Sequence, residues 1–139
     1  MIDVESRPYW IIDVLPKQVP EDSPGRYFTV ENYFLSHLEE IAGKFASMLV
    51  KLNCFHSLTV SPDDERWSGD FSPEDLVCFL RESISSHTPV FIRIQPKDAL
   101  VSFSGDDHYM TLYGPDEELL ELVRQLASAE GLFVWTLIN

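Results

Sequence analysis

The chain has 139 residues, of which 45% are hydrophobic and 12% aromatic, and a formal net charge of -13. A chain of this length buries roughly 70% of its unfolded surface, so it can form a packed core without metals or disulfides. Nucleic-acid affinity rests largely on Lys and Arg, so the charge argues against binding to nucleic acid or to an anionic membrane. It favours positively charged partners, although a purely solubilising role is the simpler alternative.

Targeting and redox features predict a cytoplasmic protein. The N-terminus has no basic region followed by an apolar run, and no apolar stretch reaches the about 18 residues of a membrane span. Cys54 and Cys78 lie in or beside apolar helical stretches without CxxC spacing, so we expect buried, reduced thiols. No dinucleotide-binding, phosphate-loop or zinc-ribbon motif occurs, and no cofactor is predicted.

The first part of the chain predicts a strand, a loop and a long helix. Residues 9–15 are apolar, β-branched and aromatic, which is typical of a buried strand. Residues 16–25 contain three prolines and one glycine and predict a loop. Residues 34–52 carry apolar side chains at spacings of three and four, which predicts an amphipathic helix. Thr29 is a candidate cap for its start, and Asn53 is a candidate left-handed stop.

The middle of the chain predicts a strand, an acidic loop and a second helix. Residues 56–60 alternate between polar and apolar side chains, as a half-buried strand does. The loop of residues 62–70 follows. Ser72 then provides a capping hydroxyl, with Pro73 at the first helical position and carboxylates in the first turn, which predicts a helix to about Ser86.

The last third predicts four strands and a third helix. Residues 90–94, 100–103 and 109–113 are predicted strands, with a hairpin turn between the last two. Residues 114–117 open a helix for which Gly131 is the candidate stop. Residues 132–138 are apolar on both alternating sets except for Thr136, which suits an interior strand.

The predicted order is therefore β-α-β-α-β-β-β-α-β, an α+β fold in one domain that spans residues 1–139. Strand–helix–strand units favour right-handed parallel crossovers, and the central strands favour an antiparallel meander. We expect a mixed sheet of about six strands with three helices packed on it.

The turn after the fourth predicted strand is the most site-like group in the chain. Asp106, Asp107 and His108 follow Gly105, and carboxylates with an imidazole could bind a divalent cation or move a proton. Gly and Asp are also the ordinary residues of hairpin tips, so a purely structural turn is the alternative.

The acidic loop is the candidate partner-binding site. Trp67 stands in the most acidic stretch of the chain, beside Asp63, Asp64, Glu65 and Asp70. A tryptophan there either packs on a small satellite cluster or anchors a partner. A further loop, around Arg26 and Tyr27, could recognise a ligand or simply cover a sheet edge.

Three hypotheses follow from these patterns. The first is a non-catalytic interaction module that binds a basic partner protein, as an immunity protein or antitoxin does. The second is a small metal-dependent or otherwise unmarked enzyme that uses Asp106, Asp107 and His108. The third is a ligand-sensing or assembly domain. Small size, strong negative charge and the lack of a catalytic motif favour the first.

Overall fold

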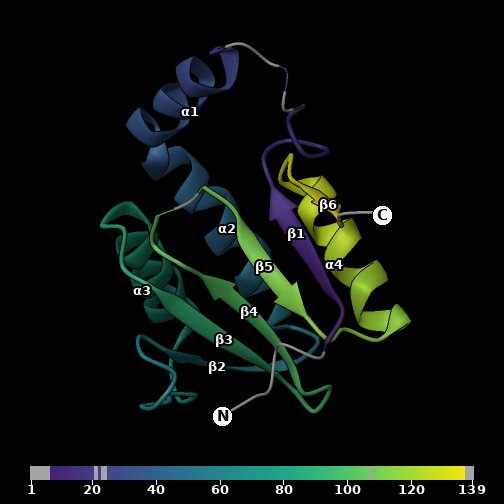
Figure 1. The fold of residues 1–139 in the computed structure, drawn as a ribbon. Coiled ribbons are helices and arrows are strands. Elements are labelled where there is room, and N and C mark those ends of the chain that lie inside the picture. Colours follow the sequence, from purple (N-terminus) through teal and green to yellow (C-terminus); the bar gives the residue numbers. More distant parts are fainter. Residues whose placement is uncertain (1–6, 21, 23–24, 107, 137–139) are drawn as a thin grey trace.

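The structure, a computed structural model, describes residues 7–20, 22, 25–106 and 108–136 (Figure 1). These residues have an α+β fold with four helices and one six-stranded sheet. The strands are β1 (Tyr9–Asp13), β2 (Ser57–Ser61), β3 (Val90–Gln95), β4 (Ala99–Phe103), β5 (Met110–Tyr113) and β6 (Phe133–Trp135). The helices are α1 (Arg26–Ser36), α2 (Leu38–Leu52), α3 (Pro73–Ser85) and α4 (Glu117–Ala129).

The prediction of three helices was wrong, because the helical region between β1 and β2 is divided in two. The helix begins well before Phe34, with Gly25 rather than Thr29 at its N-cap, and it breaks at His37. The hydroxyl of Ser36 donates to the carbonyl of Tyr33 at 2.8 Å, and Nδ1 of His37 lies 2.9 Å from the same oxygen. Side chains that bond to nearby carbonyls compete with the helical hydrogen-bond pattern.

The expected mixed sheet was also wrong, because every strand pair in the described residues is antiparallel. The spatial order is β2-β3-β4-β5-β1-β6. The predicted parallel crossovers fail because β1 does not lie beside β2: it inserts between β5 and β6. Strands β2 and β3 are antiparallel neighbours, so the connection through α3 returns the chain to the end of the sheet from which it left.

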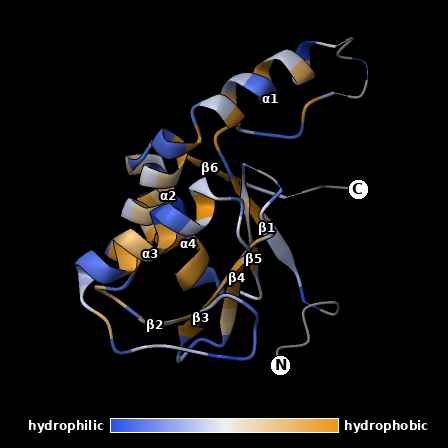
Figure 2. Ribbon diagram, turned by 90° about the vertical axis from the view of Figure 1, so that its left-hand side faces the viewer, coloured by the Kyte–Doolittle hydropathy of each residue, from blue (hydrophilic) through white to orange (hydrophobic). Residues whose placement is uncertain are grey.

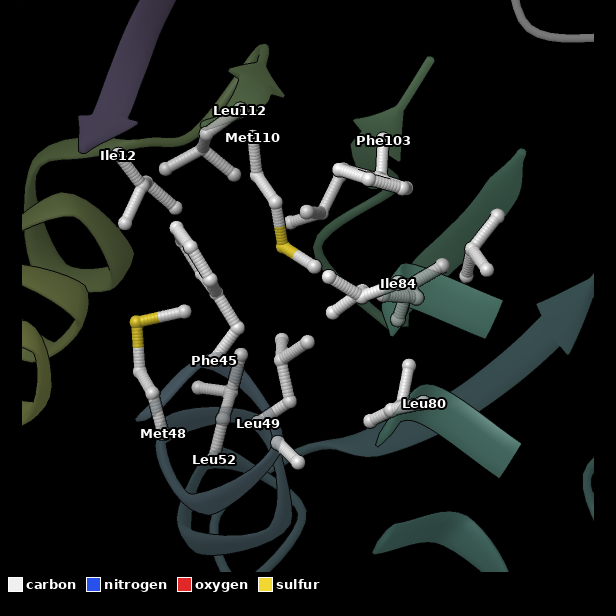
Figure 3. Close-up of a cluster of buried hydrophobic side chains, with 14 of the residues drawn as sticks. Ile12, Phe45, Met48, Leu49, Leu52, Leu80, Ile84, Phe103, Met110 and Leu112 are labelled. Atoms are coloured by element: carbon white, nitrogen blue, oxygen red, sulfur yellow. The ribbon is translucent and has the colours of Figure 1, made fainter. Parts of the chain in front are cut away.

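The core lies between one face of the sheet and the helices α2, α3 and α4. Figure 2 shows these three helices on the same side of the sheet, with α1 above its upper end. Alternate residues of the strands and the apolar stripe of each helix meet in this layer (Figure 3). The largest fully buried side chains include Ile12, Phe45, Leu80, Phe103 and Met110.

Several local predictions are confirmed. The hydroxyl of Ser72 accepts a hydrogen bond from the backbone N–H of Asp75 at 3.1 Å and caps α3, with Pro73 at its first position. Strands β4 and β5 form the expected hairpin. Gly131 follows the end of α4 with a φ of 78°, as a helix-terminating glycine should.

Other local predictions were wrong. Asn53 ends α2 in a right-handed and not a left-handed conformation. Strand β6 lies at the edge of the sheet rather than inside it, which leaves Phe133 44% exposed. Both thiols are free but exposed, since Cys54 follows the end of α2 and Cys78 faces away from the core on α3. No helix among the described residues is both long and apolar enough to cross a membrane.

Candidate functional site

A cavity of about 880 Å³ lies on the face of the sheet that α2, α3 and α4 leave open. This volume falls in the range of about 300–1,000 Å³ that is typical of small-molecule sites. Strands β5, β1 and β6 form the floor of the cavity, and the chain between Leu15 and Pro20, together with the start of α1, forms its wall. Figure 2 shows α1 reaching over this side of the sheet from above.

The alternation of side chains along the strands explains the lining. On β1, Tyr9, Ile11 and Asp13 point into the cavity, while Ile12 between them belongs to the core. The partner strand contributes Thr111 and Tyr113, and Tyr109 precedes it. Tyr9 and Tyr113 are direct cross-strand neighbours, with ring centroids 6.4 Å apart. Trp135 of β6 and two aromatic residues of α1, Tyr27 and Phe28, complete the set of rings.

A buried carboxyl–imidazole pair lies at one end of the cavity. Asp13 Oδ1 is 3.6 Å from Nε2 of His108, and the two side chains are only 6% and 3% exposed. The backbone N–H of Val14 donates to the same carboxyl oxygen at 2.7 Å. The rings of Phe34 and Tyr27 have centroids 5.1 and 6.4 Å from that of His108, so α1 helps to bury the pair.

Burial is the dominant influence on the carboxyl group. Desolvation raises the pKa of Asp13 above its usual range, because the ionised form loses its water. His108 and the backbone N–H groups of Val14 and Leu15 act in the opposite direction but do not cancel the effect. The indole of Trp135 also favours the ionised form, although its buried N–H makes no hydrogen bond of good geometry with a described residue. Such a pair can hold or transfer one proton.

Two basic residues stand at the rim of the cavity. Arg7 donates to the backbone carbonyl of Asp98, and it forms an ion pair with the carboxylate of the same residue at 3.0 Å. Lys17 is exposed and forms no ion pair with another described residue. Apart from Asp13, which faces His108, no acidic side chain contributes to the described lining. Among the described lining residues, Lys17 is thus the one lysine or arginine whose charge no carboxylate balances.

Asp106 and His108, two residues of the predicted metal site, lie in different surroundings. Asp106 is exposed at the hairpin tip, whereas His108 is buried and directed at Asp13. Asp107 lies outside the described residues. In the part of the chain that the structure describes, no three His, Cys, Asp or Glu side chains are arranged to hold a metal ion. The metal site stays a prediction. If His108 moves a proton, the carboxyl group beside it is that of Asp13.

The acidic loop is organised around one carboxylate. Asp63 accepts hydrogen bonds from the backbone N–H groups of Glu65 and Arg66, each at 2.9 Å, and from the hydroxyl of Ser61 at 3.0 Å. The guanidinium of Arg66 adds an ion pair at 2.9 Å. These donors hold the pKa of Asp63 well below its usual range. Asp64 is half-buried with a φ of 62°, so this turn uses Asp63 and Asp64 structurally.

The rest of the loop covers the edge of the sheet. Ser68 and Val60 exchange two backbone hydrogen bonds of 2.9 Å, so the loop shields part of the free edge of β2. Trp67 is half-buried, and the guanidinium carbon of Arg93 lies 4.5 Å from its ring centroid. Glu65 and Asp70 are exposed. A partner-binding role for these residues stays a prediction.

Helix α1 presents a second candidate surface, formed by Val30 and Tyr33, which lie three positions apart on one side of the helix. These two side chains, which we call the α1 surface, are 42% and 58% exposed. Phe28 is 67% exposed, but it lies on the other side of the helix and lines the cavity. Helix α1 contains no buried residue at all, unlike the other helices. Exposed large apolar side chains that gather on one element are the usual mark of an interaction site.

Neither the cavity nor the pairing of Asp13 with His108 was predicted from the sequence. The available signal was an aspartate inside an otherwise apolar strand, since a carboxylate in such a position needs a buried partner. Tyr27 was noted as part of a loop that could recognise a ligand, and it does line the cavity, but from a helix. Comparison of the chain with models of protein families, with curated proteins and with solved structures produced no significant match.

Proposed function

We propose that this protein is a non-catalytic interaction module that binds a basic partner protein. The observation that carries the proposal is the α1 surface, a pair of exposed apolar side chains, Val30 and Tyr33, on a helix that buries none of its residues. Exposed aromatic residues supply much of the binding energy in protein interfaces, because they bury a large area at a small cost in conformational entropy.

The charge of the chain supports a basic partner. From Arg26 to the first turn of α2, the one basic residue is opposed by Glu31, Glu39 and Glu40. An apolar patch inside an acidic surrounding matches a partner whose contact residues are apolar and whose rim carries Lys and Arg. The overall charge of -13 would also steer such a partner during its approach.

The acidic loop is the weaker of the two candidate docking surfaces. Its tryptophan, Trp67, is covered on one face by Arg93. The carboxylate of Asp63 already accepts hydrogen bonds from Glu65 and Arg66 of the same turn. Glu65 and Asp70 are available to a partner, but they provide charge without an apolar anchor. Figure 1 shows this loop beside β2, at the opposite end of the molecule from α1, so variants can separate the two surfaces.

The test is affinity capture from the lysate of the native host, followed by kinetics with the purified captured protein. We expect a basic protein that is retained at low salt and released at high salt. Its association rate should fall steeply over a tenfold increase in ionic strength, because screening removes long-range attraction. A rate that does not change with salt, or a capture without any basic protein, would contradict the proposal.

Three variants locate the contact. Replacement of both Val30 and Tyr33 by Ser should weaken binding by about tenfold or more, as the loss of an interface anchor does. Phe55→Ser is the matched control, because Phe55 is 63% exposed but lies after the end of α2. The variant Glu65→Gln with Asp70→Asn tests the acidic loop: a larger loss there than for the α1 pair would move the docking site to that loop.

A further inference from the structure

The side chains that line the cavity on the open face of the sheet suit a flat apolar molecule. Ile11 and Thr111 are cross-strand neighbours in its floor, and aromatic rings stand on either side of them. Tyr9 and Tyr113 lie at one end, and Trp135 is paired with Ile11 from the other neighbouring strand. Aromatic side chains bind planar ligands through stacked and edge-to-face contacts.

The charges at the rim set the sign of the ligand. Arg7 is held by Asp98, so Lys17 is the one lining cation without an ion pair among the described residues. Asp13 does not offer a free negative charge, because His108 and the N–H of Val14 already contact it. An anionic group near Lys17 would therefore be attracted, whereas a cation would meet no unpaired acid in the described lining.

The same features limit the number of charges on the ligand. Nucleotides and other polyphosphates need several donors, which are usually a glycine-rich loop or a cluster of basic residues. The described lining has neither, and the overall charge of -13 repels multiply charged anions. Among the described lining residues, only Lys17 is left to balance a charge on the ligand, which favours a ligand with a single negative charge.

We infer that the cavity binds a small aromatic molecule with one anionic group, such as an aromatic carboxylate. The ring system lies on Ile11 and Thr111 between the aromatic side chains, and the carboxylate faces Lys17. Phe28 lines the cavity, whereas Val30 and Tyr33, which form the proposed protein contact, do not. On a helix, positions 30 and 33 lie on the side away from position 28, so the two sites use different sides of α1. The two proposals can therefore fail independently.

The experiment is an NMR titration of the folded protein with three probes that share one ring system. They are 2-naphthoate, the neutral 2-naphthylmethanol and the cationic 2-naphthylmethylammonium. We expect 2-naphthoate to bind about tenfold more tightly than the alcohol, a factor that corresponds to about 1.4 kcal/mol, and the ammonium compound to bind most weakly. Chemical-shift changes should concentrate on β1, β5 and the chain between Leu15 and Pro20.

Two variants and their controls separate the charge from the cavity. Lys17→Met should remove the preference for naphthoate over the alcohol and leave the affinity for the alcohol unchanged. Lys44→Met is the control, because Lys44 is an exposed lysine on α2, on the other side of the sheet. Thr111→Trp fills the cavity and should abolish binding of all three probes, while Ser57→Trp, on the distant edge strand β2, should not.

The inference is overturned if 2-naphthoate causes no shift changes at millimolar concentration, or if the ammonium compound binds as tightly as the carboxylate. It is also overturned if Thr111→Trp folds, as judged by its NMR spectrum, and still binds naphthoate. Should Thr111→Trp fail to fold, Thr111→Phe provides the same test with a smaller ring.

Discussion

The contact between Asp13 and His108 is the residue-level feature that most distinguishes this protein from a simple α+β scaffold. Both side chains are almost fully buried, and they connect β1 to the turn between β4 and β5. Phe34 of α1 packs against the imidazole, so the pair also links the projecting helix to the sheet. Because burial raises the pKa of Asp13, its ionised form costs stability that its hydrogen bonds do not fully return.

We predict that Asp13→Asn makes the protein more stable at pH 7. The pKa of Asp13 is higher in the folded than in the unfolded chain, so its contribution to stability is full below the unfolded value and is lost as the pH rises through the folded value. Asparagine cannot ionise, and its side-chain oxygen can still accept from the N–H of Val14. Urea unfolding should show a higher free energy of unfolding than for the unchanged protein at pH 7, and this gain should shrink towards pH 4.

The control for this prediction is Asp22→Asn, which neutralises an exposed acid. Its effect on the free energy of unfolding should be small at both pH values. If Asp13→Asn instead destabilised the protein more at pH 7 than at pH 4, the ionised pair with His108 would be the stabilising form, which would contradict the prediction.

At the scale of elements, the helices show where local sequence signals suffice. The start of α3 follows from Ser72 and Pro73, and Asp116 caps α4 by accepting from the N–H of Leu119 at 2.8 Å. The boundary between α1 and α2 carries no such signal, since the apolar spacing continues across it. Only the side-chain bonds of Ser36 and His37 to one carbonyl reveal why the helix breaks there.

Two glycine substitutions should have opposite effects on stability. Gly43 lies inside α2, and an added Cβ would meet no atom within 4 Å, so Gly43→Ala should stabilise the protein by about 0.5–1 kcal/mol. Gly105 has a φ of 98°, and its Cβ would lie 2.6 Å from the carbonyl oxygen of His87. Gly105→Ala should therefore destabilise by more than 1 kcal/mol.

Urea unfolding at pH 7 measures both variants. A loss of stability in Gly43→Ala would mean that α2 requires close contact at this position. A neutral Gly105→Ala would mean that the turn before β5 can shift away from His87 without cost.

At the scale of the whole molecule, the surplus of acidic residues is the dominant property. Ion pairs join only some of them to bases, as for Lys51 with Glu130 at 2.6 Å and Lys97 with Asp116 at 2.9 Å. The remaining acids repel one another in the folded state more than in the expanded chain, because folding brings them closer together. This repulsion opposes folding and also provides the field that would attract a basic partner.

We predict that salt stabilises the protein. The Debye length is about 10 Å at 0.1 M, so an increase in NaCl from 20 to 200 mM should screen most of the repulsion between exposed acids. Calorimetry at pH 7 should show a rise in Tm of about 2–5 °C, with the same rise in KCl. A Tm that falls with salt would mean that the ion pairs outweigh the repulsion.

Much of this fold could be predicted from the chain alone. Local hydrogen bonding and side-chain periodicity determine where a helix or strand forms, so the positions of α2, α3, α4 and the hairpin of β4 and β5 follow from the sequence. The charge of -13 is likewise a property of the sequence alone. The sequence did not predict which strands pair with β1, because an apolar strand can pair with any exposed edge of suitable length.

The tertiary structure alone revealed the cavity and the pair of Asp13 with His108. Asp13 is the last residue of β1, and His108 lies just before β5, far away in the chain. The two residues meet only because β1 is inserted between β5 and β6. The same insertion places Tyr9 opposite Tyr113 and Ile11 opposite Trp135, which creates the floor of the cavity. The sequence determined most of the helices and strands, with α1 as the exception, because those signals are local. Strand pairing is non-local, and the cavity depends on it.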